Sequence, residues 1–283
     1  MEIAEHIDTL DRDGALLADA AERAGLAAPV PSCPGWRIRD LVRHQAYVHG
    51  WAARHVGEQR PELIDEADEA AILGGGPPDG DLIAAYRAGL AALVTALREA
   101  DPGVQCATFM PAPSPLAFWA RRQAHETAIH RFDAQAAAPG GAPWPAAAFE
   151  PAFAEDGVDE LIMGFAPRRR YRPRKERAED ELSVAVRAGD TGGRWRVRFA
   201  GGATEVTRGA GAADCVLDGP AAGLYAFLWN RCDSARATSR SSSHAGMHPR
   251  PSPLCLSPSQ CWRAARPASC DAPLQPIFRL SRA

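Results

Sequence analysis

Lysine is almost absent from this chain of 283 residues: Lys175 is the only one among 32 basic residues, and all the others are arginine. Alanine, glycine and proline are abundant, a composition typical of proteins from GC-rich genomes. The chain also lacks a strong charge of either sign. Its formal net charge of −3 gives no electrostatic reason to expect nucleic-acid binding.

Long hydrophobic runs are missing as well. No uninterrupted apolar stretch approaches the roughly 20 residues of a membrane span, and residues 1–25 contain acids but no apolar core of the signal-peptide kind. The seven cysteines include no CxxC pair, and their spacing fits no zinc module. We therefore expect a cytoplasmic monomer that binds neither membrane nor nucleic acid.

The first part of the chain has helical periodicity. Four amphipathic helices joined by loops predict an antiparallel four-helix bundle over residues 1–145, although the first and third loops are not short. Asp79 or Asp81 can cap the third helix, and Ser114 followed by Pro115 is a start signal for the fourth. The helices are expected over residues 2–25, 37–55, 79–97 and 114–137.

The second part, residues 148–231, has a different hydrophobic pattern. Its short alternating runs LSVAVRA, RWRVRFA, TEVTRG and DCVLDG predict a small antiparallel sheet. Helical stretches, FAEDGVDELIMGF before the runs and GPAAGLYAFLWNR after them, flank this sheet, and a charged linker over residues 168–181 separates the first helix from it. The predicted fold class is therefore α+β: the bundle followed by a small α+β domain.

The third part, residues 232–283, is rich in serine, proline and arginine and shows no lasting apolar periodicity. Seven arginines stand there against only two acids. A disordered regulatory tail is one interpretation. We favour a frameshift near codon 232, because GC-rich codons read out of frame give mostly arginine, alanine, proline, serine and cysteine. In either case we expect this tail to be disordered.

The stretch HETAIH, residues 125–130, nearly matches the zinc-protease motif HExxH but has one residue too many. On a helix, positions four apart differ by about 40° around the axis and positions five apart by roughly 140°. Glu126 and His130 therefore share a face, whereas His125 and His130 do not. Glu126 and His130 form either a solvated surface pair or half of a metal site.

A third ligand is available in the second helix. His44 lies three residues after Leu41, on or beside the apolar stripe, whereas His49 points to another face. A histidine in that position can simply be hydrogen-bonded in the core. Bundles, however, build metal sites from inward side chains on facing helices, and His44, Glu126 and His130 would form a three-ligand set with an open fourth position. Zinc suits these ligands best, with nickel, cobalt and ferrous iron as alternatives.

Two segments that contain these residues, VPSCPGWRIRDLVRHQAYVHGWA and RRQAHETAIHRFDA, resemble the signature segments of the mycothiol-dependent maleylpyruvate isomerase family. The resemblance covers about residues 5–231. It implies a DinB-like metal-binding bundle with a small C-terminal domain, in which His44, Glu126 and His130 bind zinc. It also implies mycothiol as thiol cosubstrate and an actinobacterial host, and it makes Arg231 a candidate catalytic residue. A helix-terminal arginine near the last carbonyls is the alternative for Arg231.

The resemblance implies a small electrophilic substrate, which Arg231 could hold if it carries a carboxylate. In an isomerase the thiol adds to a cis double bond, the new single bond rotates, and the thiol leaves. In a thiol transferase the adduct is released. Two other functions remain open from the residues alone: a non-catalytic metal-binding or regulatory bundle, and the poorly folding product of a damaged gene.

Overall fold

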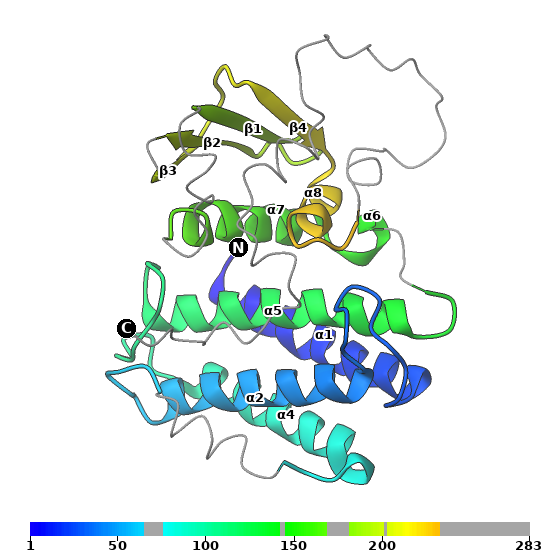
Figure 1. Cartoon of the computed structure of the whole chain (residues 1–283). Coiled ribbons are helices and arrows are strands. Elements are labelled where there is room, and N and C mark those ends of the chain that lie inside the picture. Colours follow the sequence, from blue (N-terminus) through cyan, green and yellow to red (C-terminus); the bar gives the residue numbers. More distant parts are fainter. Residues whose placement is uncertain (65–75, 142–144, 169–180, 201–202, 233–283) are drawn as a thin grey trace, which may run out of the picture. The chain divides into compact units, whose positions relative to one another are not determined.

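The computed structural model describes residues 1–64, 76–141, 145–168, 181–200 and 203–232. The chain divides into two compact units, one comprising Met1–Pro143 and the other beginning at Trp144 (Figure 1). The predicted α+β architecture is confirmed, with helices in the N-terminal part and a four-stranded sheet in the C-terminal part. The predicted linker over 168–181 and the predicted tail over 232–283 lie outside the described residues, apart from Arg168, Glu181 and Cys232.

Four long helices form the first unit, close to the predicted segments. Their packed side includes Leu17, Leu41 and Tyr86, all of which are fully buried. The helices are α1 (Ile3–Ala24), α2 (Ile38–Gly57), α4 (Leu82–Glu99), which follows the short 3-10 helix η1 (Asp79–Asp81), and α5 (Pro115–Ala137).

The helix starts differ in how they are capped. Ser114 caps α5 as predicted, because its hydroxyl accepts a hydrogen bond from the backbone N–H of Ala117 at 3.1 Å. The predicted cap of α4 is wrong. Asp81 stands at the N-cap without a side-chain hydrogen bond to the helix, and the Asp79 carboxylate instead accepts hydrogen bonds from Arg39 and Arg43.

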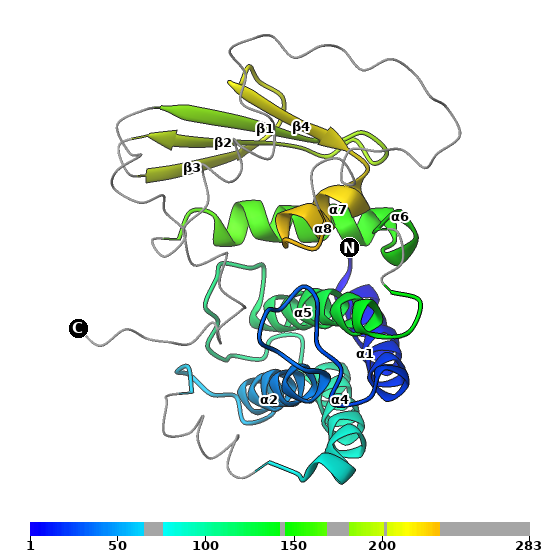
Figure 2. The ribbon, with the colours of Figure 1, turned by 45° about the vertical axis from the view of Figure 1, so that its right-hand side comes forward.

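The predicted four-helix bundle is present, but it is not antiparallel throughout: the helices pack as two parallel pairs, α1 with α5 and α2 with α4 (Figures 1 and 2). Contacts advance in the same direction along α1 and α5, where His6 meets His125 and Asp13 meets Arg131. Between the pairs, α1 with α4 and α2 with α5 are antiparallel. Successive helices α1 and α2, and likewise α4 and α5, are diagonal to each other. The first and third loops are long because each joins two diagonal helices across the bundle.

One described helix, Asp79–Glu99, is long and apolar enough by length and composition alone to cross a membrane. Core helices of bundles pass the same test. Here Leu82, Tyr86, Leu90 and Leu93 are buried, and the helix packs on α1 and α2.

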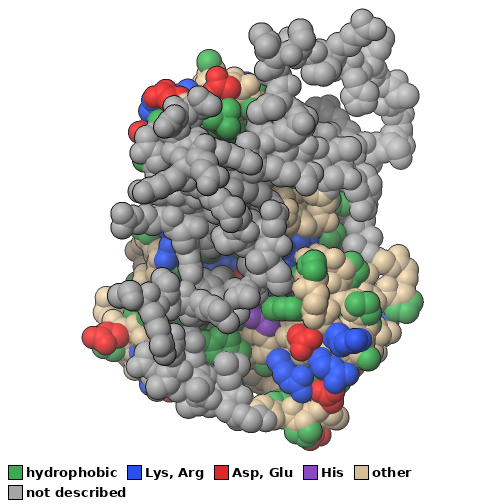
Figure 3. Space-filling model, in the orientation of Figure 1, with side chains coloured by type: hydrophobic (Ala, Val, Ile, Leu, Met, Phe, Trp, Pro, Cys, Tyr) green, Lys and Arg blue, Asp and Glu red, His purple; other side chains and the backbone are tan. Residues whose placement is uncertain are grey.

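Many surface charges of the bundle are paired between helices. Arg87 of α4 binds Asp19 of α1 at 2.8 Å, and Arg98 of α4 binds Asp8 of α1 at 3.0 Å. Figure 3 likewise shows arginine side chains beside acidic ones on the described surface of the bundle. Charges of both signs are therefore interspersed on this part of the surface.

The second unit combines helices with the sheet. Its first long helix continues into a π-helical turn, and its last helix is buried along its whole length. The elements are α6 (Pro145–Ala148), α7 (Pro151–Asp159), η2 (Glu160–Phe165), β1 (Leu182–Ala188), β2 (Arg194–Ala200), β3 (Ala203–Arg208), β4 (Cys215–Gly219) and α8 (Ala221–Leu228).

The sheet has the order β3-β2-β1-β4. The β1–β2 and β2–β3 pairs are antiparallel, but β1 and β4 are parallel, so that the prediction of a wholly antiparallel sheet was wrong. Val184 of β1 pairs with Val197 on one side and Cys215 on the other. Alternation along a strand shows which of its faces is buried but does not identify its neighbours, which is why the position of β4 was missed.

A buried ion pair joins α1 to α5. Asp13 and Arg131 approach to 3.2 Å, and both side chains are nearly inaccessible to solvent. We predict that Asp13→Ala lowers the free energy of unfolding by about 3 kcal/mol, because it leaves a buried guanidinium without its carboxylate. Chemical denaturation measures this change.

Asp8→Ala is the matched control, because Asp8 is also on α1 and pairs with an arginine of another helix, but on the surface. It should change stability by no more than about 0.5 kcal/mol. Equal losses in the two variants would contradict the role given to burial.

Candidate metal centre

The three predicted ligands come together inside the bundle. His44 of α2 and Glu126 of α5 approach through Nε2 and Oε1 at 3.1 Å, and the same Oε1 lies 3.3 Å from Nε2 of His130. One donor atom from each of the three residues lies within 4.8 Å of the other two. Glu126 and His130 are buried, and the His44 side chain is 10% exposed.

These distances resemble those between the ligand atoms of a tetrahedral metal ion. With bonds of about 2.0–2.2 Å, such donor atoms lie about 3.3–3.6 Å apart. Nε2 of His130 is buried and faces Oε1 of Glu126 at 3.3 Å without the geometry of a hydrogen bond. A buried nitrogen that is not well hydrogen-bonded is costly, and a cation between it, His44 and Glu126 would satisfy it. The residues therefore fit a divalent metal ion.

Asp133, which the sequence analysis did not single out, orients His130. Its Oδ2 lies 2.8 Å from Nδ1 of His130, and both side chains are fully buried. A carboxylate on one ring nitrogen directs the other toward a metal, an arrangement common around metal-binding histidines. The signal was present in the sequence, because Asp133 follows His130 by three residues and lies on the same side of the helix.

Arg122 holds the other oxygen of Glu126. Arg122 precedes Glu126 by four residues on α5, and its guanidinium donates a hydrogen bond to Oε2 at 2.7 Å. Both side chains are buried. Oε1 is then the oxygen that faces the two histidines. Arg122 was also not predicted, since an i,i+4 Arg–Glu pair is usually a surface feature.

The buried charges shift the pKa values of the three residues. Burial lowers the pKa of His44. Burial alone would raise the pKa of Glu126, but the two histidines and Arg122 outweigh it and hold that pKa well below its usual range. Burial would lower the pKa of His130, but Asp133 and Glu126 raise it. Glu126 is therefore ionised and His44 neutral at pH 7. The raised pKa of His130 means that a metal ion must compete there with a proton when the pH falls below that pKa.

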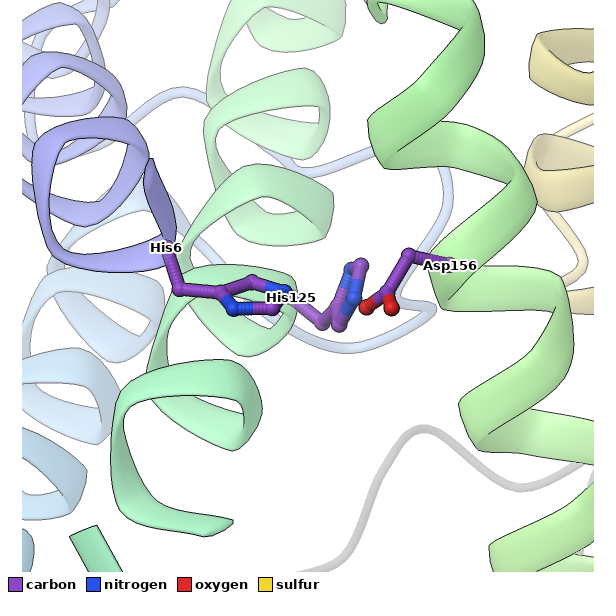
Figure 4. Close-up of side chains that lie close together, drawn as sticks. All are labelled: His6, His125 and Asp156. Atoms are coloured by element: carbon purple, nitrogen blue, oxygen red, sulfur yellow. The ribbon is translucent and has the colours of Figure 1, made fainter. Parts of the chain in front are cut away.

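The remaining histidines of α2 and α5 have other partners. His125 lies against His6 of α1, with ring centroids 5.9 Å apart (Figure 4). Nε2 of His49 lies 2.8 Å from the Thr127 hydroxyl, and burial lowers the pKa of His49 to about 3. His125 and His130 thus point apart, as their five-residue spacing requires.

Trp36 borders the candidate centre. Its ring is tilted against His44, with centroids 5.2 Å apart, and stacked on His130 at 6.2 Å. Trp36 is partly exposed, whereas His130 is not. Nothing in the sequence indicated this contact, because Trp36 belongs to a loop and not to a periodic element.

Arg231 follows α8 in the second unit. Its guanidinium donates to the carbonyl of Trp229 at 2.5 Å, and its backbone N–H donates to Ala226 at 2.7 Å. The first of these contacts is of the kind expected for a helix-terminal arginine. The catalytic role of Arg231 stays a prediction.

Comparisons with known proteins match both units. The family model described as mycothiol maleylpyruvate isomerase N-terminal domain matches residues 7–135, and the C-terminal domain model of the same family matches residues 152–246. The second match continues past Arg231 into the segment assigned to the tail. No curated protein sequence shows significant similarity to the chain.

Two solved structures are similar in fold. A crystal structure of the mycothiol-dependent maleylpyruvate isomerase has a TM-score of 0.57 and 13% identity, covering 82% of this chain and 90% of its own. A histidine-to-alanine mutant of it has a TM-score of 0.55 and 12% identity over the same shares. At these identities the similarity establishes the fold only.

The ligand set predicts a difference between two buried histidines of one helix. His130→Ala should abolish stoichiometric zinc binding, because it removes a ligand, whereas His125→Ala should retain it. Both variants remove an imidazole that is fully buried on α5, so their losses of stability are comparable. Metal content is measured by mass spectrometry after dialysis. Zinc retained by His130→Ala would exclude this site.

The raised pKa of His130 predicts a pH dependence. Below that pKa a proton occupies the histidine, so the apparent zinc affinity should fall about tenfold per pH unit, and above it the affinity should level off. Competition with a chelator measures the affinity between about pH 6 and pH 8. An affinity that does not change over this range would contradict the proton displacement.

Proposed function

The chain belongs to the mycothiol maleylpyruvate isomerase family, and on this premise we propose that it is a mycothiol-dependent metalloenzyme acting on a small electrophilic substrate. Isomerisation is the reaction of the similar solved protein, and thiol transfer is the related possibility. The observation that carries the proposal is the convergence of His44, Glu126 and His130, with one donor atom of each within 4.8 Å of the other two.

In this proposal His44, Glu126 and His130 hold a divalent ion, zinc being the best match to two imidazoles and a carboxylate. When bound, the ion supplies the positive charge that stabilises a deprotonated thiol at neutral pH. The histidines present Nε2 and the glutamate presents Oε1. Asp133 keeps the His130 ring in place through Nδ1, and Arg122 keeps the second oxygen of Glu126 away from the ligand positions.

The charges around the site support an anionic thiol ligand. Glu126 and Asp133 supply two negative charges and Arg122 one positive charge, all on buried side chains. A divalent cation then leaves one positive charge in excess. In a buried, poorly solvated place this excess favours one further anion, such as a thiolate.

We propose that the thiol is mycothiol, that the protein works in the cytoplasm as a monomer, and that the substrate carries a carboxylate. The thiol would add to an electrophilic carbon. If the substrate has a cis double bond, the addition turns it into a single bond that can rotate. Loss of the thiol then re-forms the double bond in the trans configuration. Arg231 is the candidate for holding the carboxylate, because its planar guanidinium can donate two parallel hydrogen bonds.

A non-catalytic metal-binding protein is the alternative, and turnover separates the two functions. We expect the zinc-loaded full chain to isomerise maleylpyruvate only when mycothiol is present, or to couple mycothiol to another electrophile. Activity should be lost on removing zinc and restored on adding it back. Stoichiometric zinc with mycothiol binding but no reaction on a panel of electrophiles would favour the non-catalytic protein.

Arg231 generates a separate prediction. Arg231→Ala should lower kcat/KM for a carboxylate substrate by about 10- to 100-fold, because a charged hydrogen bond to the substrate contributes about 1.5–3 kcal/mol. Arg231→Lys should retain only part of the wild-type kcat/KM, since lysine keeps the positive charge but cannot donate two parallel hydrogen bonds. Zinc content should not change in either variant.

Arg198→Ala is the matched control, because Arg198 is in the same unit and pairs with Glu181 and Glu205 on the surface. It should leave kcat/KM unchanged. Wild-type turnover in Arg231→Ala would end the catalytic interpretation of Arg231.

A further inference from the structure

The segment Val30–Trp36, called here the Trp36 loop, is closed by its own backbone. The N–H of Val30 donates to the carbonyl of Trp36 at 2.9 Å, and the N–H of Trp36 donates to Cys33 at 2.9 Å. Gly35 has a φ of +87°, which a residue with a Cβ rarely adopts, so glycine allows the turn before Trp36. The loop therefore presents the Trp36 ring as part of a compact unit.

Asp133 connects this loop to α5. Its Oδ1 accepts a hydrogen bond from the Ser32 hydroxyl at 2.5 Å, and its Oδ2 lies 3.7 Å from Sγ of Cys33. The same Oδ2 contacts Nδ1 of His130 at 2.8 Å. One fully buried carboxylate thus binds the loop and a candidate metal ligand together, and the Trp36 ring is stacked on that ligand with centroids 6.2 Å apart.

We propose that Asp133 is a positioning residue that couples the Trp36 loop to the metal site. A metal ion that fixes the ring orientation of His130 also fixes the carboxylate of Asp133, which in turn holds Ser32 and the loop. Conversely, an ordered loop holds Asp133 and so keeps the His130 ring in its ligating orientation. Coupling between two sites is reciprocal, so that zinc binding orders the loop by as much as the loop strengthens zinc binding.

Through this coupling the loop forms part of the wall of the proposed active site. The Trp36 ring lies near both histidines and is itself partly exposed, so in this proposal it borders the place where a thiol and a substrate arrive. A loop stabilised by the metal would hold that wall in place more firmly in the loaded protein. This inference rests on the proposed metal site.

The test uses Ser32, which contacts Asp133 but none of the three ligands. Zinc affinity is measured for the full chain by competition with a chelator. Ser32→Ala should weaken zinc binding at least about fivefold, and Ser32→Thr, which keeps the hydroxyl, should restore it. Asp133→Asn should weaken it by about 10- to 100-fold.

Ser114→Ala is the control. Ser114 also makes one side-chain hydrogen bond in the first unit, but it caps α5 and does not contact Asp133. It should leave zinc affinity unchanged even though it lowers stability. Equal zinc affinity in Ser32→Ala and the wild type, or equal losses in Ser32→Ala and Ser114→Ala, would overturn the coupling.

A second readout does not depend on activity. Hydrogen–deuterium exchange of the backbone N–H groups of Cys33 and Trp36 should slow when zinc is added to the wild type, and slow much less in Ser32→Ala. If the wild type binds zinc but the exchange rates of these N–H groups do not change, the coupling is refuted and the metal site is not. A wild type that binds no zinc would instead refute the metal site, and the coupling with it.

Discussion

A single oxygen of Glu126 lies between imidazole nitrogens from two helices, 3.1 Å from His44 and 3.3 Å from His130. A carboxylate buried to this extent would be strongly destabilising without compensation. Arg122 and the two histidines provide it, which ties the positions of α2 and α5 to each other. The site is therefore part of what determines how these two helices pack, and the functional geometry and the bundle are stabilised together.

Helix α5 is unusual because it is buried on nearly all sides although it is rich in polar residues. Its buried side chains include Arg122, Gln123, Glu126, His130 and Asp133. A helix with so many polar groups inside is a poor choice for stability alone, and such departures from simple patterning are expected at functional sites. The polar groups are organised so that charges meet opposite charges, with Arg122 on Glu126 and Asp133 on His130.

Local periodicity was sufficient to predict the long helices and all four strands, because amphipathic repeats and strand alternation act within a few residues of the chain. The three candidate ligands were also accessible from the sequence, since Glu126 and His130 share a helix face and His44 borders an apolar stripe. Three features were not predictable: the parallel pairing of α1 with α5, the parallel pairing of β4 with β1, and the contact of Trp36 with the histidines. Each feature depends on which segments, far apart in the sequence, become neighbours in the fold. Local sequence patterns do not contain this information.

X-ray absorption at the zinc edge tests the central claim most directly, because it reports the atoms around the ion. For the zinc-loaded full chain we predict nitrogen and oxygen neighbours at about 2.0–2.2 Å with the outer-shell signature of imidazole, and no sulfur. On adding mycothiol one sulfur neighbour should appear at about 2.3 Å. Sulfur ligands before the thiol is added, or an unchanged spectrum after it, would contradict the account.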